Sequence, residues 1–295
     1  MRNKIDGVLT AIVTPFDSEG ALNLKALKEQ VTRQRQAGNS IFCGGTNGEF
    51  FVLNEKEKVT VTQTCVDEVA GQAHVVAHIG EISTRETIRL GKQIEKLGVD
   101  AVSVITPYFV PLQQQELISH YTSIADALTV PLFLYNIPAR TGNTIEPETA
   151  RILAAHPNII GIKDSAGSYQ SLSGFLNAVK DIDDFDVLNG PDSLIHQGFV
   201  EGCSACISGL ANVAPKAINT IWSRYKAGDI DGSRQAQESV TQLRSELYQV
   251  AFSPAAVKKA LQLMGYAVGE SRYAVEFSPQ QESVIRQLIA NIAHE

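Results

Sequence analysis

The sequence predicts an α/β protein, a TIM (β/α)8 barrel with a C-terminal helical extension. Three observations support this prediction. Eight short, apolar, β-rich runs recur at intervals of about 20 to 35 residues, the rhythm of repeated βα units. The segments between these runs carry helical periodicity. No glycine-rich first turn of the G-x-G-x-x-G kind is present, which makes a doubly wound sheet the weaker alternative.

The predicted strands occupy the first three quarters of the chain. They are residues 8–13, 41–44, 75–79, 101–105, 132–135, 159–163, 185–188 and 205–207. The first predicted helix, 21–37, repeats leucines at helical spacing and stops before Gly38, a natural C-cap. The stretch 84–97 stops in the same way before Gly98. Pro147 suits the first turn of a helix that runs towards residue 155.

The last quarter of the chain changes to helical patterns alone. These patterns cover 216–226, 231–250, 254–264 and 279–293. We therefore expect a barrel catalytic domain over residues 1–225 and a helical extension over residues 226–295. The extension would either cover the barrel or bind another subunit, and the sequence leaves both alternatives open.

Composition and charge narrow the class of function. Apolar residues make up 44% of the chain, as in an ordinary globular protein, and the net charge of −7 argues against nucleic acid or an anionic membrane as a partner. The sequence opens with no charged-then-apolar leader, and no apolar run approaches the roughly 18 residues of a membrane span. We expect a cytoplasmic protein with a small-molecule substrate.

Four cysteines are present, and two of them, Cys203 and Cys206, form a C-x-x-C pair. Redox or zinc chemistry would need a redox-type βαβ context or a second pair of ligands, and neither is visible. We therefore interpret all four as buried thiols and expect no metal site.

The most informative strand ends in Ile162-Lys163-Asp164. A lysine after a strand is usually a solvated loop residue or an ion-pair partner, here for Asp164. The alternative is a lysine held at an apolar wall, where desolvation favours the neutral amine and allows it to attack a carbonyl carbon and form a Schiff base. In barrels of this kind the chemistry lies at the carboxyl ends of the strands, which is where Lys163 falls.

The second strand ends in Gly44-Gly45-Thr46-Asn47-Gly48-Glu49. Asn-Gly is a strong hairpin signal, but no second strand follows within hairpin distance. Instead Asn54-Glu55-Lys56-Glu57 has the pattern of a helix cap and first turn. Clustered N–H groups around Gly45, flanked by the Thr46 and Asn47 side chains, would bind a small carboxylate such as that of a 2-oxo acid.

Other strand ends supply further candidates. Tyr135 is either a core aromatic residue or a proton shuttle within reach of Lys163. Arg140 could bind a second carboxylate or a hydroxyl-rich tail. Tyr108 and Phe109 are either packed loop residues or substrate contacts. Asp192 and Ile207 follow or end the last two predicted strands, where small neighbouring residues leave room for a ligand.

Four motifs in register resemble those of the dihydrodipicolinate synthase / N-acetylneuraminate lyase family. They are Gly45-Thr46-Asn47-Gly48-Glu49, Tyr135-Asn136-Ile137-Pro138, Gly161-Ile162-Lys163-Asp164, and Ile207-Ser208 with Asn212. The resemblance covers essentially the whole chain. It implies a TIM barrel that assembles as a homotetramer, uses no metal or organic cofactor, and holds pyruvate as a lysine Schiff base.

The resemblance also implies roles for individual residues. Lys163 would be the Schiff-base lysine and Tyr135 the proton shuttle, with Thr46 and Asn47 as carboxylate-binding and relay positions. The main-chain carbonyl of Ile207 would lie near the reacting carbons. The iminium on Lys163 would act as an electron sink, and the resulting enamine would add to an aldehyde or remain after a C–C bond breaks.

Departures from the dihydrodipicolinate synthase pattern favour the aldolases among the family's members. Dihydrodipicolinate synthases usually carry two threonines at Thr46-Asn47 and a tyrosine, donated across a dimer interface, at Phe109. Arg140 nevertheless matches the arginine that they use for the aldehyde substrate. Asn47 with the later Lys163-Asp164-Ser165 is similar to 4-hydroxy-2-oxoglutarate aldolase and to other 2-keto-3-deoxy acid aldolases.

We therefore expect a Schiff-base-dependent carbon–carbon lyase that acts on a 2-keto-3-deoxy or 4-hydroxy-2-oxo acid. The alternatives are 4-hydroxy-tetrahydrodipicolinate synthase, from pyruvate and aspartate semialdehyde, and then N-acetylneuraminate lyase. Against the latter, Ser193 and Gly209 replace its glutamate and serine. A non-catalytic 2-oxo-acid-binding protein is the alternative from another class, and the presence of Lys163 together with Tyr135 argues against it.

Overall fold

The computed structural model describes residues 4–292. Eight parallel strands form a closed barrel in the order of the sequence, which confirms the predicted fold class. Contacts within the chain group it into two compact units. One unit consists of Val75–Ile207 together with residues 4–6, and the other consists of Gly7–His74 together with the chain from Ser208 onward.

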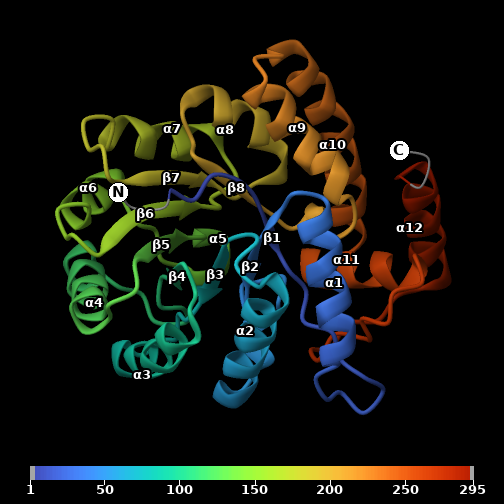
Figure 1. The fold of residues 1–295 in the computed structure, drawn as a ribbon, viewed down its shortest axis with the longest axis horizontal. Helices are drawn as coiled ribbons and strands as arrows, with labels where there is room; N and C mark the ends of the chain where they lie inside the picture. The colour runs from blue at the N-terminus through green and yellow to red at the C-terminus, as the bar shows by residue number, and fades with distance from the viewer. Residues whose placement is uncertain (1–3, 293–295) are drawn as a thin grey trace. The chain divides into compact units, whose positions relative to one another are not determined.

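The unit around Val75–Ile207 alternates strands with helices. Figure 1 shows its helices α3, α4, α6 and α7 along the outside of its strands. Its strands are β3 (Val75–His78), β4 (Ala101–Ile105), β5 (Leu132–Asn136), β6 (Ile159–Asp164), β7 (Asp186–Asn189) and β8 (Ala205–Ser208). Its helices are α3 (Thr84–Ile94), η2 (Glu95–Leu97), α4 (Gln114–Ala127), α5 (Pro138–Thr141), α6 (Pro147–Leu153), α7 (Tyr169–Ala178), η3 (Asp192–Leu194) and α8 (Ile195–Glu201).

The strands of this unit are buried along their whole length. Every residue of β4, β5 and β6 is buried, as expected for parallel strands covered on both faces. The parallel register pairs Ile105 with Tyr135, Tyr135 with Lys163, and Lys163 with Leu188. Residues paired in this way point to the same face of the sheet, so the register places Tyr135 and Lys163 side by side.

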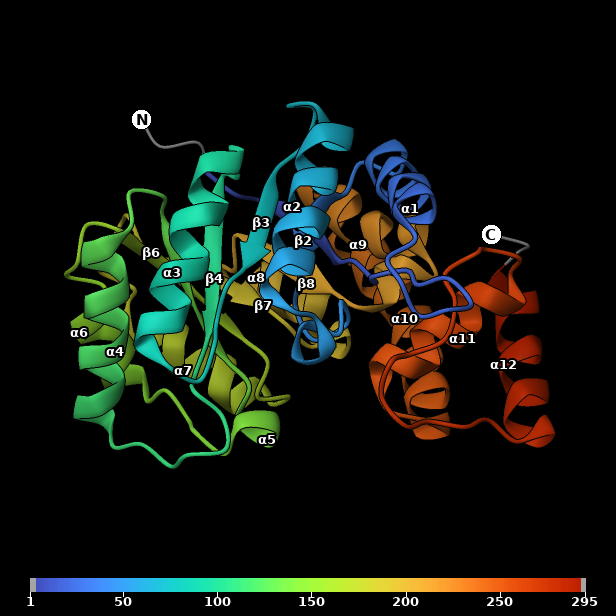
Figure 2. The ribbon, with the colours of Figure 1, turned by 90° about the horizontal axis from the view of Figure 1, so that it is seen from below.

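The second unit combines Gly7–His74 with the C-terminal part of the described chain. Its elements are β1 (Gly7–Ala11), α1 (Leu24–Gln36), β2 (Ser40–Cys43), η1 (Phe50–Val52), α2 (Glu55–Val69), η4 (Leu210–Asn212), α9 (Pro215–Lys226), α10 (Ile230–Val250), α11 (Ser253–Leu263) and α12 (Pro279–Ile292). Figure 2 shows α12 packed beside α10 and α11. The buried Asn212 ties η4 to the first strand, since its Nδ2 donates to the Ala11 carbonyl at 2.8 Å and its Oδ1 accepts from the Val13 N–H at 3.1 Å.

The predicted elements agree with the observed ones to within a few residues. The predicted helix 21–37 begins later, at Leu24, because the side chain of Asn23 accepts a hydrogen bond from the Ala26 N–H and caps it. The four predicted C-terminal helices are all present, and residue 293 of the last one lies outside the described residues. The domain boundary near residue 225 stays a prediction. None of the helices within residues 4–292 combines the length and apolar content that a membrane span requires.

Candidate active site

Lys163 and Tyr135 form the centre of the candidate site in the Val75–Ile207 unit. The side chains come from the carboxyl ends of adjacent strands, β6 and β5. The Lys163 residue is 4% exposed and Tyr135 is 2% exposed. The Lys163 Nζ atom lies over the Tyr135 ring, 3.9 Å from its centroid. The structure therefore brings together the two residues expected to act as nucleophile and proton shuttle.

The Tyr135 ring also contacts His78, which the sequence analysis did not single out as a site residue. The two rings are edge to face, with centroids 6.0 Å apart and planes at 89°. Gly80 permits this packing, because a Cβ atom at that position would lie 2.7 Å from the Ile105 nitrogen and 3.0 Å from the His78 Nε2. His78 thus helps to fix the orientation of the tyrosine.

Asp164 is not the ion-pair partner of Lys163 that the simplest interpretation of the sequence suggested. Its Oδ1 accepts hydrogen bonds from the Asn136 Nδ2 at 2.8 Å and from the Ala166 N–H at 3.2 Å. Successive residues of a strand point to opposite faces, so Asp164 and Lys163 diverge. Burial raises the pKa of the Asp164 carboxyl, and its hydrogen bonds oppose that shift.

The loop after β4 carries Tyr108 and Phe109. Phe109 is 92% exposed and adopts a left-handed backbone with φ of 74°, which a bulky residue rarely does. Asn143 holds this loop. Its Nδ2 donates to the carbonyls of Pro107 and Val110, at 2.7 Å each, and its Oδ1 accepts from the Leu112 N–H at 2.8 Å.

The remaining candidates of this unit differ in exposure. Burial and then the charge of Glu81 raise the pKa of the half-buried Tyr108. Arg140 is exposed on the one-turn helix α5, whereas Asp192 and Ile207 are buried.

The glycines that follow β7 and β8 are closely packed. A Cβ atom on Gly190 would lie 2.0 Å from the Ser165 Oγ and 2.7 Å from the Asp164 carbonyl oxygen. The corresponding position on Gly209, in the other unit, is also crowded by neighbouring side chains. At these two glycines the position of a side chain is therefore occupied by neighbouring protein atoms, and the expected room for a ligand at these strand ends stays a prediction.

In the second unit, Gly45, Thr46 and Asn47 lie in a tight turn after β2. The turn begins at Gly44, with φ of 65°, and ends at Glu49, with φ of 56°. A Cβ atom on Gly45 would lie 2.3 Å from a ring carbon of Phe42, so only glycine fits there. Thr46 and Asn47 are half-buried. The chain then continues into η1 and α2, which confirms the expected helix start in place of a hairpin.

The start of the following helix and one atom of the turn differ in their hydrogen bonding. The Asn54 side chain and Glu57 form the predicted capping box at the start of α2. The Oδ1 atom of Asn47 is buried and has no hydrogen-bond partner among the described residues. A buried oxygen of this kind is a site for a donor from a ligand.

Sequence reasoning missed Tyr248, a residue of α10. A Cβ atom on Gly209 would lie 2.9 Å from the Tyr248 hydroxyl and 2.6 Å from the Asn47 Nδ2, so all three residues meet. The Arg244 guanidinium lies over the Tyr248 ring, 5.5 Å from its centroid. A tyrosine in the middle of an amphipathic helix gives no local sequence signal that it meets Gly209 and Asn47.

Comparisons with known proteins agree with this geometry. The sequence model of the dihydrodipicolinate synthetase family matches residues 4–291. The chain belongs to the dihydrodipicolinate synthetase family. A 4-hydroxy-tetrahydrodipicolinate synthase of Trichlorobacter lovleyi is 37% identical over 267 residues, which are 90% of this chain and 91% of the relative.

Solved structures of dihydrodipicolinate synthases are similar over nearly the whole chain. The enzyme of Thermotoga maritima aligns with a TM-score of 0.94 and 33% identity, over 98% of this chain and 99% of that one. The enzyme of Acinetobacter baumannii, solved as a complex with pyruvate, aligns with a TM-score of 0.94 and 32% identity over the same shares. The predicted family and the prediction of a class I pyruvate aldolase, a carbon–carbon lyase, are confirmed.

The four cysteines are not themselves residues of the family motifs, although Cys206 directly precedes Ile207. All four are buried and free. Burial raises the pKa of the Cys203 thiol to about 12 and that of Cys206 well above its ordinary value, so neither is an activated nucleophile. Within the described chain, no group of three or more His, Cys, Asp or Glu side chains is arranged to hold a metal ion.

Proposed function

We propose that this protein cleaves or forms a C–C bond between pyruvate and an aldehyde, with Lys163 as the Schiff-base residue. The observation that carries the proposal is the buried amine of Lys163, 3.9 Å from the ring centroid of the equally buried Tyr135. A buried lysine at the end of a barrel strand lies where catalytic residues of barrels are found, and its nitrogen is a nucleophile that forms Schiff bases with carbonyl substrates.

The chemistry follows from these two side chains. The Lys163 nitrogen bonds to the carbonyl carbon of the 2-oxo acid, and the carbonyl oxygen leaves as water. Loss of a proton from the adjacent carbon gives an enamine, which bonds to the aldehyde carbon or is left behind by cleavage. Hydrolysis of the iminium then frees the lysine. Tyr135 is assigned the proton transfers.

The turn in the other unit is assigned to substrate recognition. Gly45, Thr46 and Asn47 present backbone N–H groups and short polar side chains that suit a carboxylate, with Thr46 as the relay residue. The Oδ1 of Asn47, which has no partner among the described residues, is assigned to a substrate donor such as a hydroxyl group. A carboxylate alone has no such donor.

These features favour a 2-keto-3-deoxy or 4-hydroxy-2-oxo acid as the substrate. The substrate hydroxyl would supply the donor for Asn47, and the exposed Arg140 is assigned to a distal carboxylate or hydroxyl. Ile207, Tyr108 and Asp192 complete the proposed contacts with the 2-oxo acid and its tail. Phe109 has no hydroxyl with which to join a proton relay.

The second candidate is 4-hydroxy-tetrahydrodipicolinate synthase activity. It is favoured by the Trichlorobacter lovleyi relative of that name and by Arg140. N-acetylneuraminate lyase activity is less compatible with the site, because the Gly209 position has no space for the serine that the resemblance implies.

One assay separates these candidates. Pyruvate release would be measured from 4-hydroxy-2-oxoglutarate, 2-keto-3-deoxygluconate and its epimers, and N-acetylneuraminate, beside condensation of pyruvate with aspartate semialdehyde. Release from a deoxy acid with weak condensation supports the first candidate. Strong condensation without release supports the second. Arg140→Ala should raise KM most for substrates with a charged or hydroxylated tail.

Borohydride trapping tests the catalytic proposal itself. Pyruvate plus borohydride should modify Lys163, and Lys163→Ala should fold normally without turnover. An unmodified Lys163 in folded protein would instead indicate a non-catalytic 2-oxo-acid-binding protein.

The proposed chemistry needs no metal or organic cofactor, so dialysis against a chelator should leave turnover unchanged. We expect a cytoplasmic homo-oligomer, a tetramer by family resemblance, and light scattering measures the oligomeric state.

A further inference from the structure

Two hydrogen bonds fix the turn that carries Thr46 and Asn47. Within the turn, the Glu49 N–H donates to the Thr46 carbonyl at 3.0 Å. At its base, the Thr14 Oγ1 donates to the Gly48 carbonyl at 2.7 Å. Glu49 itself is fully buried and has a left-handed backbone, a conformation that persists in a non-glycine residue only when its surroundings hold it.

The C-terminal helices supply what holds Glu49. Its Oε1 pairs with the Nζ of Lys258, a residue of α11, and both side chains are almost completely removed from water. Its Oε2 accepts a hydrogen bond from the backbone N–H of Arg272 at 3.1 Å. Both carboxylate oxygens of Glu49 are therefore engaged by the C-terminal part of the chain.

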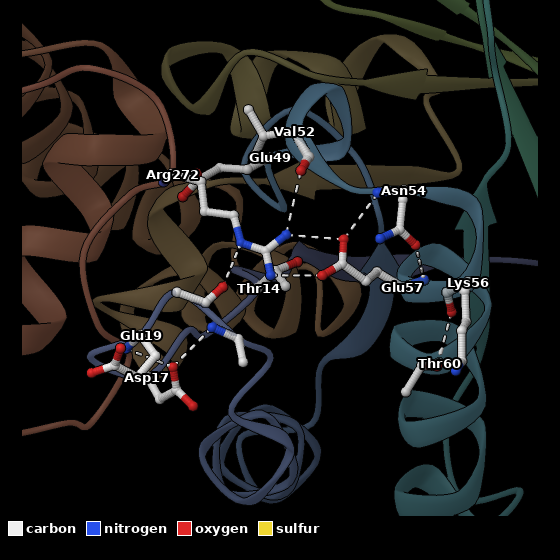
Figure 3. Close-up of polar contacts among 12 residues, drawn as sticks. Thr14, Asp17, Glu19, Glu49, Val52, Asn54, Lys56, Glu57, Thr60 and Arg272 are labelled. Carbon is white, nitrogen blue, oxygen red and sulfur yellow. Dashed lines mark hydrogen bonds and ion pairs between the residues drawn. The ribbon is translucent and has the colours of Figure 1, made fainter.

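The Arg272 side chain makes a second connection close to the first. Figure 3 shows its guanidinium bound to Glu57 through two hydrogen bonds, Nη1 to Oε2 at 2.9 Å and Nη2 to Oε1 at 2.6 Å. The Nε also donates to the Gly20 carbonyl at 2.7 Å. Two-pronged pairs of this kind fix orientation as well as distance.

The Phe16 ring contacts both cations. The Lys258 Nζ is 4.2 Å and the Arg272 Cζ is 4.1 Å from the centroid of its ring. The ring stabilises both charges through its π system. Glu49, Glu57, Lys258 and Arg272 thus form one ionic cluster around the Phe16 ring, in which Glu49 and Lys258 are buried and Glu57 and Arg272 are half-buried.

We propose that Lys258 is a positioning residue for the reaction, which sets the geometry of the carboxylate-binding turn through its ion pair with Glu49. This inference rests on the proposed function of that turn. It also gives the helical extension a role in substrate recognition within a single chain.

The physical basis is that the N–H groups at Thr46 and Asn47 must point at the substrate carboxylate. Small misplacement of a binding group weakens binding and catalysis strongly. A purely structural role for Lys258 would lower stability alone. A positioning role also changes the concentration of pyruvate needed for half-maximal reaction.

The test compares three variants with the wild-type protein. Lys258→Met removes one partner of the pair and leaves Glu49 buried without it, which is strongly destabilising. The double variant Glu49→Gln/Lys258→Met removes both charges and keeps the shapes similar, so it remains testable if the single variant does not fold. Leu261→Ala, a fully buried position on the same helix, is the matched control for lost stability.

Each protein is measured for thermal stability and for the pyruvate dependence of borohydride trapping at Lys163. We expect the half-saturating pyruvate concentration to rise about tenfold or more in the Lys258 variants that fold, and to stay within about twofold of wild type in Leu261→Ala. Half-saturation unchanged in the folded Lys258 variants, or raised equally in Leu261→Ala, overturns the inference. Absence of trapping in the wild-type protein overturns the proposed function instead, so the two failures are distinguishable.

Discussion

The Lys163 amine lies 3.9 Å from the ring centroid of Tyr135, and both residues are buried. The ring face packs against the amine, while the phenol oxygen at the edge of the ring is the group proposed to transfer protons. These two functions reside in different parts of one side chain, so a substitution can remove one and keep the other.

Tyr135→Phe should keep the ring beneath Lys163 and lose the proton transfer. We expect kcat to fall by about 10² to 10⁴, the usual contribution of general acid–base catalysis. Borohydride should still trap pyruvate on Lys163, more slowly than in the wild-type protein. Steady-state kinetics and mass spectrometry of the trapped lysine give the two readouts. A kcat within a few-fold of wild type would show that another group moves the protons.

Gly209→Ser should disturb Asn47. The new Cβ would lie 2.6 Å from the Asn47 Nδ2 and 2.9 Å from the Tyr248 hydroxyl, too close for either. We expect KM for the 2-oxo acid to rise about tenfold through displacement of Asn47. Adding Tyr248→Phe removes the crowding oxygen and should restore part of the loss, with Tyr248→Phe alone as the control. The displacement argument is wrong if the second substitution brings no recovery.

The sequence predicted the fold well because the signals are local. Each strand is a short apolar run that ends in turn-forming residues, and a helix start such as Asn54 to Glu57 is encoded within four residues. The strand-end rule for barrels then located Lys163 and Tyr135 without any knowledge of their contacts.

The parts of the site that the sequence did not predict depend on residues far apart in the chain. Lys258 and Lys259 are neighbours with identical side chains, yet only Lys258 pairs with Glu49, which lies 209 residues earlier. Tyr248 meets Gly209 and Asn47 through the packing of α10. Local periodicity predicts which face of a helix is buried, but it does not predict which distant charge a buried lysine meets.

Asn143→Ala should loosen the loop that carries Phe109. The substitution removes three hydrogen bonds, to Pro107, Val110 and Leu112, from a residue that is 3% exposed. We expect the free energy of unfolding to fall by roughly 2 to 3 kcal/mol, because buried loop groups lose their partners. Urea unfolding measures this loss, and limited proteolysis should cut near residues 107–112 sooner than in the wild-type protein.

Asn143→Asp is the matched control for that loop. It keeps an acceptor for the Leu112 N–H but replaces the donor to two carbonyls by a carboxylate oxygen. We expect it to be at least as destabilising as the alanine variant. Greater stability in the aspartate variant would contradict the assigned hydrogen-bond directions.

His120 should make stability depend on pH. Burial lowers the pKa of its imidazole to about 4, and its Nδ1 lies 2.8 Å from the Thr84 Oγ1. The unfolded chain takes up a proton near pH 6.5 and the folded protein does so only near pH 4, so protonation favours unfolding between these values. The contribution to stability is complete above pH 6.5 and is lost as the pH falls through about 4. Its size is at most about 3 kcal/mol, from the difference between the two pKa values.

The test compares His120→Asn with the wild-type protein. Asparagine retains a polar atom near the Thr84 hydroxyl but does not titrate. Denaturant unfolding at pH 7 and at pH 4.5 gives two free-energy differences, and subtracting one from the other cancels the constant effect of the smaller side chain. We expect the wild-type protein to lose more stability than the variant on acidification. Equal losses in the two proteins would show that His120 takes up its proton equally well in the folded state, and that burial does not govern its titration.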